Sequence, residues 1–283
     1  MSVVERMSGA PIVRSDLERV RYRTFRPSSL PAPQAAELFN AMREVARAAT
    51  MGPLGSTWVD ADWERRRNQF ERSICYSAWS SGRLIGFMWT RRIPVEHWRV
   101  VHLQAAFVLP QHHGQGIGFA MNARMVLREA AGLLGPRGVL VADMLSPVAF
   151  HGWRSRARRA ADFFPCLDEF GRPSESSLEQ VAVAISSELY PGVRFDSSSG
   201  VLRSKTPDRD APVGLSGRPE VDAYFAEFID GSRGDTALVV MRPSATEFIA
   251  NAGEIFKAVW RAVRRNPLRT HRQAEVRECG GQR

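Results

Sequence analysis

The chain has 283 residues, of which 44% are hydrophobic and 24% are charged, and its formal net charge is +9. This length suits one catalytic domain with an extension, because domains usually contain about 150 residues. No run approaches the roughly 18 apolar residues that a membrane span needs, and the N-terminal segment lacks the apolar stretch of a secretory signal, so we expect a cytoplasmic protein.

The positive charge is concentrated near the C-terminus. From Lys257 onward the chain has eight Lys or Arg residues and two Glu residues, so the rest of it is only mildly basic. A basic field attracts polyanions, but a basic tail alone is more typical of a solvated terminus, and we expect no nucleic acid as a partner. Cys75, Cys166 and Cys279 lie far apart without a CxxC pattern, which predicts reduced thiols and no bound metal.

The N-terminal half predicts a strand, two helices and then a run of strands. Residues 1–20 show no pattern, and a short edge strand should end at Pro27. Residues 28–49 have apolar positions at helical spacing, and residues 57–73 predict a second, charged helix. The stretch ICYSAWSSGRLIGFMWTRR predicts a hairpin around Ser-Ser-Gly-Arg. A strand at 99–108, a helix at 115–133 and a buried strand at 138–145 complete this half.

Beyond Pro165 the sequence becomes richer in turn residues. The predicted elements are a helix at 178–190, a hairpin at 192–204, a polar linker at 204–219, a helix at 219–230, a strand at 235–241 and a final helix at 244–265. The final helix has one wide apolar face beside several cations. That face should pack on the chain's own sheet or on a second copy of the chain; an anionic membrane surface is the less favoured alternative.

A glycine-rich loop stands between the strand at 99–108 and the helix that follows it. The loop reads QHHGQGIG, with glycine at positions 114, 116 and 118. Glycines at a helix N-terminus expose backbone N–H groups to a ligand, and the helix dipole favours an anion there. Phe119 and Ala120 exclude the Gly-Lys-Ser/Thr ending of a Walker loop, and the third glycine of a dinucleotide fingerprint is missing.

The stretch FVLPQHHGQGIG resembles the acyl-CoA loop of the GNAT superfamily of acyl-CoA-dependent N-acyltransferases. The family pattern is a valine, one residue, a proline and then Q/RxxGxG/A, and Val108, Pro110 and Gln111 fall in register with it. The resemblance covers residues 21–165 and implies an α/β (α+β) fold with a mixed, mostly antiparallel central sheet flanked by helices. Residues 1–20 are then a lead-in, and residues 166–283 are an extension that completes the sheet.

The resemblance also implies where acyl-CoA binds. In the family, the strand before the loop splays away from its neighbour at a bulge, and the pantetheine arm lies in the gap. The backbone of Phe107 and Val108 would pair with pantetheine, and the loop amides would wrap the pyrophosphate. The implied pyrophosphate-binding residues are His113, Gly114, Gln115, Gly116, Ile117 and Gly118. The His113 side chain would either add a phosphate contact or stay an exposed loop imidazole.

The family's usual acid–base residues are missing. Gln104 stands where many members have a catalytic Glu, and Trp153 stands where many members have a Tyr that acts as the general acid. His102, two residues before Gln104, and His151, near Trp153, are the titratable candidates that could replace them. Asp143 on the buried strand is a weaker candidate. The sequence therefore predicts that no single acid–base residue dominates the rate.

The sequence thus favours an N-acyltransferase that moves an acyl group, acetyl by default, from acyl-CoA to an amine of a small molecule, with no metal. Two alternatives remain open. One is a catalytically degenerate domain that binds CoA or acyl-CoA as a regulatory module. The other is an acyltransferase that accepts its acyl group from an acidic acyl carrier protein, to which the basic tail would be attractive. The sequence is compatible with a homodimer. It does not identify the amine that accepts the acyl group.

Overall fold

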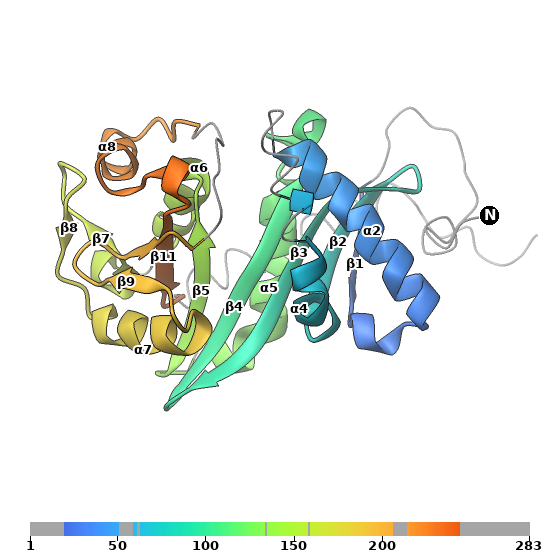
Figure 1. The fold of residues 1–283 in the computed structure, drawn as a ribbon, viewed down its shortest axis with the longest axis horizontal. Helices are drawn as coiled ribbons and strands as arrows, with labels where there is room; N and C mark the ends of the chain where they lie inside the picture. The colour runs from blue at the N-terminus through green and yellow to red at the C-terminus, as the bar shows by residue number, and fades with distance from the viewer. Residues whose placement is uncertain are drawn as a thin grey trace, which may run out of the picture.

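The computed structural model describes residues 20–50, 59–60, 63–133, 135–157, 159–205 and 214–243 (Figure 1). The predicted final helix at 244–265 and part of the linker at 204–219 lie outside the described residues. Within the described residues, no helix is long and apolar enough to cross a membrane.

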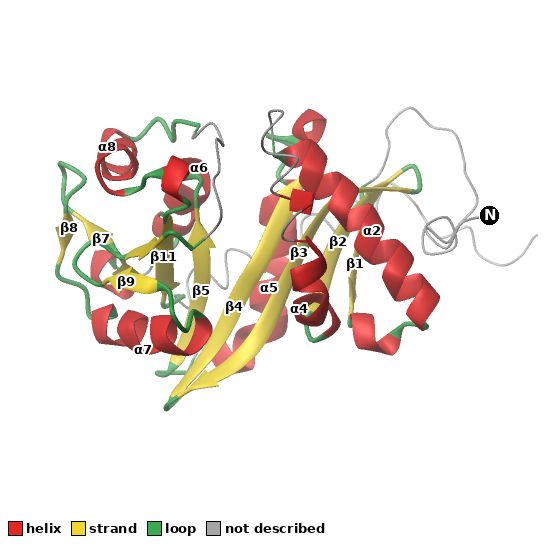
Figure 2. Cartoon of the chain, in the orientation of Figure 1, coloured by secondary structure: helices red, strands yellow, loops and turns green. Residues whose placement is uncertain are grey.

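The central sheet has the strand order β1-β2-β3-β4-β5-β11-β10-β9 among the described residues (Figure 2). Neighbouring strands pair antiparallel except β4 and β5, which pair in parallel. The strands are β1 (Arg21–Phe25), β2 (Ile74–Ser80), β3 (Arg83–Val95), β4 (Trp98–Val108), β5 (Gly138–Met144), β9 (Arg194–Asp196), β10 (Val201–Arg203) and β11 (Thr236–Met241). The predicted mixed, mostly antiparallel sheet is confirmed.

Helices cover both faces of this sheet. The main helices are α2 (Ala32–Ala49), α4 (Arg67–Glu71), α5 (Ile117–Leu133), α6 (Pro147–Arg154), α7 (Glu179–Leu189) and α8 (Pro219–Phe228). One face packs against α5, α6 and α8 through a shared apolar cluster. The other face packs against α2 and α4 at one end and α7 at the other. The two helix layers therefore exclude water from both faces of the central strands.

Most predicted elements agree with the structure because their signals are local. The hairpins β2–β3 and β9–β10 form at the predicted turns, and β9, β10 and β11 extend the sheet beyond β5 as expected. The second predicted helix is interrupted: the described residues 59, 60 and 63 are helical, and the 3-10 turn η2 (Glu64–Arg66) leads into α4.

Several short elements carry no periodic signal and were not predicted. They are the strands β6 (Phe163–Phe164), β7 (Cys166–Leu167) and β8 (Pro173–Ser174) and the 3-10 turns η1 (Pro27–Ser29), η3 (Pro110–His112), η4 (Ala160–Asp162) and η5 (Gly231–Arg233). A strand of two residues is too short to show the alternation of apolar and polar positions that identifies a strand in sequence.

An ion pair between Arg203, whose side chain is 33% exposed, and the buried Asp235 connects β10 to the start of β11 just before Lys205. Asp235, 2% exposed, accepts hydrogen bonds from the Arg203 guanidinium at 2.8 Å and the Ser204 backbone N–H at 2.9 Å. Arg203 also bonds to Asp196 on β9 at 3.1 Å. These contacts fix the chain direction where β10 ends.

We predict that Asp235→Ala lowers the free energy of unfolding by about 2 kcal/mol, because the Arg203 guanidinium and the Ser204 N–H lose a buried, charged hydrogen-bond acceptor, although Asp196 still pairs with Arg203. Glu64→Ala is the control, since the exposed Glu64–Arg67 pair should contribute less than about 1 kcal/mol. Denaturant titration of both variants measures the difference. Equal effects would contradict a structural role for Asp235.

Candidate active site

The strands β4 and β5 separate halfway along β4. Their parallel pairing runs from Arg99↔Gly138 to Leu103↔Ala142 and then stops, and Figure 1 shows β4 leaning away from β5 beyond that point. The separation coincides with a bulge, because β3 pairs Thr90 with Leu103 and Trp89 with Ala105. Gln104 is therefore the extra residue on β4, where its carbonyl accepts a hydrogen bond from Arg66 at 3.2 Å.

The glycine loop follows the C-terminal end of β4. Gly114 and Gly116 have φ angles of +75° and +74°, which side chains with a Cβ disfavour. The carbonyl of Gly116 accepts a hydrogen bond from the Ala120 N–H at 2.9 Å, so the α5 helix begins inside the loop. The first N–H groups of a helix have no partner within it and are available to an anion.

Gly118 differs from the other two glycines of the loop. It lies within α5 without a left-handed φ, and a Cβ built there would meet no atom within 4 Å. The protein's own conformation therefore does not require glycine at this position, and its missing side chain leaves room beside the helix N-terminus.

The side chains of the loop fold back onto the chain. The His113 imidazole Nε2 lies 2.9 Å from the Val108 carbonyl oxygen, and the Gln115 side-chain amide donates to the Gln111 carbonyl at 3.2 Å. These contacts leave the backbone of Gly114 and Gly116 exposed. The His113 ring thus contacts the end of β4, although the residue remains exposed.

Four polar side chains meet where β4 and β5 begin to separate. His102 comes from β4, Asp143 from β5, Tyr190 from the C-terminal cap of α7, and Lys205 from the segment after β10. The Tyr190 hydroxyl lies 3.0 Å from His102 Nε2 and 3.0 Å from Asp143 Oδ1. Lys205 forms an ion pair with Asp143 Oδ2, and its ammonium group lies over the Tyr190 ring. We call these four residues the polar cluster.

Burial and charge set the protonation of the polar cluster. Burial alone would raise the pKa of Asp143, but the Lys205 ammonium and the His102 imidazole outweigh it and hold that pKa well below its usual range. Burial, followed by the negative charge of Asp143, raises the pKa of Tyr190. Burial lowers the pKa of His102 despite the nearby carboxylate. Asp143 is therefore ionised near neutral pH, and His102 and Tyr190 are neutral.

The sequence-predicted histidines lie on different elements and opposite faces of the sheet. His102 alternates with Val101 on β4 and shares the face of Val100, which packs with α7. His151 is half-buried on α6, a helix of the face that α5 covers. Trp153 is 6% exposed and belongs to that core, so its indole has a packing role. The structure thus does not bring His151 to the polar cluster.

Tyr190 and Lys205 were not predicted as site residues. Tyr190 follows His102 by 88 positions, and Lys205 begins a polar linker that shows no motif. Their place in the cluster depends on the packing of α7 and on the course of the chain after β10, which no local pattern reveals.

Sequence comparison identifies the region that contains these features. Residues 39–135 match a family model described as the acetyltransferase (GNAT) family. These residues form a GNAT domain. The match includes the bulge at Gln104 and the whole glycine loop, so the family resemblance found in the sequence is confirmed. No curated protein matches the chain.

Several solved structures that resemble the chain are acetyltransferases. The PaiA N-acetyltransferase of Thermoplasma acidophilum, in complex with coenzyme A, is 13% identical, with 79% of this chain and 99% of that chain covered and a TM-score of 0.35. A GNAT family acetyltransferase of Brucella melitensis, in complex with acetyl-CoA, is 17% identical, with coverages of 44% and 76% and a TM-score of 0.33. With TM-scores this low, the family assignment depends on the sequence match.

A third similar structure is the diaminobutyrate acetyltransferase EctA of Paenibacillus lautus, in complex with L-2,4-diaminobutyric acid and coenzyme A. It is 17% identical, with 48% of this chain and 72% of that chain covered and a TM-score of 0.33.

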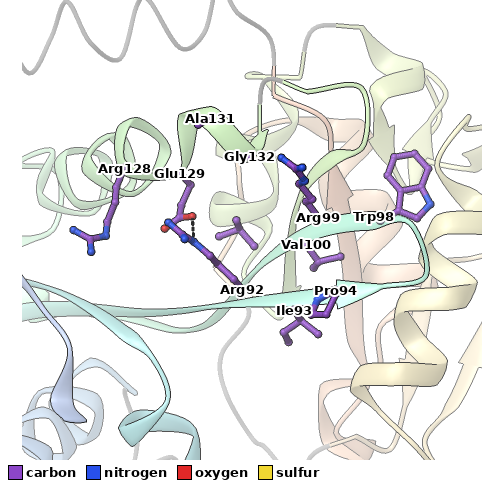
Figure 3. A pocket seen from close by; sticks show the side chains of 11 residues that line it. Arg92, Ile93, Pro94, Trp98, Arg99, Val100, Arg128, Glu129, Ala131 and Gly132 are labelled. Carbon is purple, nitrogen blue, oxygen red and sulfur yellow. Dashed lines mark hydrogen bonds and ion pairs between the residues drawn. The ribbon is translucent and has the colours of Figure 1, made fainter. Parts of the chain in front are cut away.

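The GNAT domain also has a cavity of about 410 Å³ at the other end of α5 from the glycine loop. There the buried Glu129 of α5 faces Arg92 of β3 (Figure 3), with Oε2 2.5 Å from the guanidinium Nε. Because the cavity is lined by the far ends of β3, β4 and α5, it is separate from the glycine loop. Within the described residues, no group of three His, Cys, Asp or Glu side chains could hold a metal ion.

We predict that glycine substitutions in the loop have opposite effects on stability. Gly114→Ala should lower the free energy of unfolding by about 1–2 kcal/mol, because alanine is strained at a left-handed φ. Gly118→Ala should raise it by up to about 1 kcal/mol, because alanine fits the space and favours the helix. Thermal or denaturant unfolding of the two variants measures both effects. A destabilising Gly118→Ala would show that the protein itself requires that glycine.

Proposed function

We propose that this protein is an acyltransferase that moves an acyl group, acetyl by default, from acyl-CoA to the amine of a small molecule. The observation that carries the proposal is the course of β4. This one strand parts from β5 at a bulge, bears the buried His102 at the parting point, and leads into a glycine loop at a helix N-terminus. An anion site and a titratable group are thus joined by an open strand edge.

The proposed place of acyl-CoA follows from the free backbone groups. The pyrophosphate would bind the amides of the loop from Gly114 to Gly118, because the helix dipole and glycines favour an anion there. The His113 N–H, which the sequence also suggested, donates to the Pro110 carbonyl at 3.0 Å instead. The pantetheine arm would lie beside Phe107 and Val108, past the point where β5 stops pairing with β4. The His113 ring now occupies the Val108 carbonyl. The pantetheine arm therefore either displaces this ring or bonds to other backbone groups along the same edge of β4.

The proposed chemistry needs a neutral amine, because an ammonium ion has no lone pair to attack the thioester carbonyl. A general base within reach of the amine removes its proton, and this typically contributes 10²- to 10⁴-fold to the rate. His102 suits this role better than His151, because it lies at the strand separation and burial keeps it neutral near pH 7. The expectation that no acid–base residue dominates is therefore revised in favour of His102.

A second candidate function is CoA binding without catalysis. Gln104 and Trp153 support it, because neither side chain can transfer a proton, and Trp153 is packed in the core. A third candidate, with an acyl carrier protein as donor, depends on the basic tail, which lies outside the described residues.

One experiment separates these functions. Mass spectrometry of the purified protein detects co-bound CoA or acyl-CoA. A panel of amines is then assayed for thiol release from acetyl-CoA, from longer acyl-CoAs and from an acylated carrier protein. Amine-dependent thiol release supports the acyltransferase. CoA binding without turnover of any amine supports the regulatory module, and turnover confined to acyl carrier protein donors supports the third candidate.

We predict that Gly118→Glu weakens CoA binding at least about 100-fold, because the new carboxylate would occupy the space of the diphosphate and repel its charge. Gly132→Glu is the matched control: it adds the same charge to the same helix, also where a Cβ meets no atom within 4 Å, but at the other end. Calorimetry with CoA measures both affinities. Unchanged affinity in Gly118→Glu would overturn the assignment of the loop.

We predict that His102→Gln lowers kcat by about 100-fold or more, the range of a lost general base, whereas His151→Gln lowers it by less than about 10-fold. Both variants keep a polar side chain, and circular dichroism checks that they fold. Steady-state kinetics with the best amine of the panel measures the effect. A larger loss in His151→Gln would place the base on α6 instead.

A further inference from the structure

The polar cluster determines which nitrogen of His102 carries a proton. The Tyr190 hydroxyl is 3.0 Å from both the carboxylate oxygen of Asp143 and Nε2 of His102. A hydroxyl has a single proton to donate, and its oxygen accepts hydrogen bonds. Tyr190 can therefore donate to Asp143 or to His102, but not to both.

The ionised state of Asp143 decides between these arrangements. A carboxylate without a proton can only accept hydrogen bonds, and Lys205 holds Asp143 in this state through their ion pair. The Tyr190 O–H must then donate to Asp143. Its oxygen is left to accept a hydrogen bond from His102, so Nε2 of the imidazole carries a proton.

We propose that Tyr190 and Asp143 are positioning residues that hold His102 as the Nε2–H tautomer and so leave its Nδ1 as the proton acceptor. In neutral imidazole the nitrogen without hydrogen has a free lone pair. Nδ1 of His102 is buried and has no hydrogen-bond partner among the described residues, as expected of a group that is kept for a ligand. This inference rests on the proposed acyltransferase function and names the atom that performs its proton transfer.

The proton balance of the step is simple. The neutral acceptor amine loses one proton to Nδ1 as its bond to the acyl carbon forms, and His102 becomes an imidazolium. The bond between the acyl carbon and the CoA sulfur then breaks, and CoA leaves as a thiolate. Nε2–H stays on the Tyr190 oxygen, and the Asp143 carboxylate, with Oδ1 3.7 Å from Nε2, stabilises the new positive charge. The proton returns to solvent or to the departing thiolate when the product leaves.

Charged groups from several elements face His102 and tune this base. The carboxylate of Asp143 on β5 favours the imidazolium, whereas the cations of Lys205 and of Arg66 in η2 disfavour it. Tyr190, at the C-terminal cap of α7, contacts the His102 ring edge-on. Arg91 on β3 is the residue that pairs with His102 in the sheet. Because Lys205 and Asp143 neutralise each other, removing Asp143 leaves two cations without the opposing charge.

The tautomer can be tested without any assay of acyl transfer. The protein contains six histidines, and ¹⁵N NMR of their imidazoles distinguishes a protonated nitrogen from a bare one. The signals of His102 are assigned by their loss in His102→Gln. We expect the Nε2–H form in the wild type near pH 7, and a mixture with the Nδ1–H form in Tyr190→Phe. A wild-type His102 in the Nδ1–H or imidazolium form would overturn the inference.

A pH titration of the same signals tests the part played by Asp143. Burial places the pKa of His102 below its ordinary value of about 6.5. Asp143→Asn should lower it further, because the amide keeps the shape of the carboxylate but loses the charge that favours the imidazolium. An unchanged or raised pKa in Asp143→Asn would contradict the role of Asp143 as the stabilising charge.

Kinetics connect the tautomer to the reaction. Tyr190→Phe should lower kcat by about 10- to 100-fold while the KM for acyl-CoA stays within about threefold, because the loop is untouched. Tyr224→Phe is the matched control: its buried hydroxyl bonds to the Ser199 carbonyl at 2.8 Å on another part of the fold, and its kcat should stay near that of the wild type.

The NMR and kinetic measurements distinguish a failure of the proposed function from a failure of the proposed role of Tyr190. If the wild type transfers no acyl group to any amine, the proposed function fails, and the NMR spectra still report the tautomer. If the wild type is active but Tyr190→Phe changes neither the tautomer nor kcat, the positioning role of Tyr190 is wrong and the proposed function stands.

Discussion

The parting of β4 from β5 is the constraint on which the other features of this molecule depend. Backbone N–H and C=O groups must find partners when they are buried, and after Leu103 and Ala142 the two strands no longer supply them to each other. The sheet continues on each side, with β1 to β3 beyond β4 and with β11, β10 and β9 beyond β5. The edge left between these two halves is where an extended ligand can add its own hydrogen bonds.

Charge compensation makes a buried polar cluster tolerable at this point. An isolated carboxylate in the interior is costly, and a lone buried imidazole is driven to its neutral form. Asp143 is offset by Lys205, whose place follows the turn that Arg203, Ser204 and Asp235 hold at the end of β10. The strands added after β5 therefore do more than extend the sheet, because they bring a cation to the site.

The glycine loop and the polar cluster use different physical means on the same strand. At the loop, backbone amides and the start of α5 provide positive potential without any charged side chain. At the cluster, burial keeps His102 neutral, and a paired carboxylate and ammonium group lie beside it. The glycine loop and the polar cluster thus belong to different parts of β4, since the loop follows the C-terminal end of the strand and His102 lies within it.

The sequence alone determined the features that depend on neighbours along the chain. Gly114, Gly116 and Gly118 with Pro110 revealed the loop and the family, because a left-handed φ and a helix start have local residue requirements. The hairpins followed from their turn residues for the same reason. Tertiary structure decided which candidate histidine lies in the polar cluster, since His102 and His151 lie on opposite faces of the sheet. Tertiary structure also brought Tyr190 and Lys205 to the cluster from distant segments. The positions of α7 and of the end of β10 depend on burial against residues far away in the sequence, which no spacing along the chain reveals.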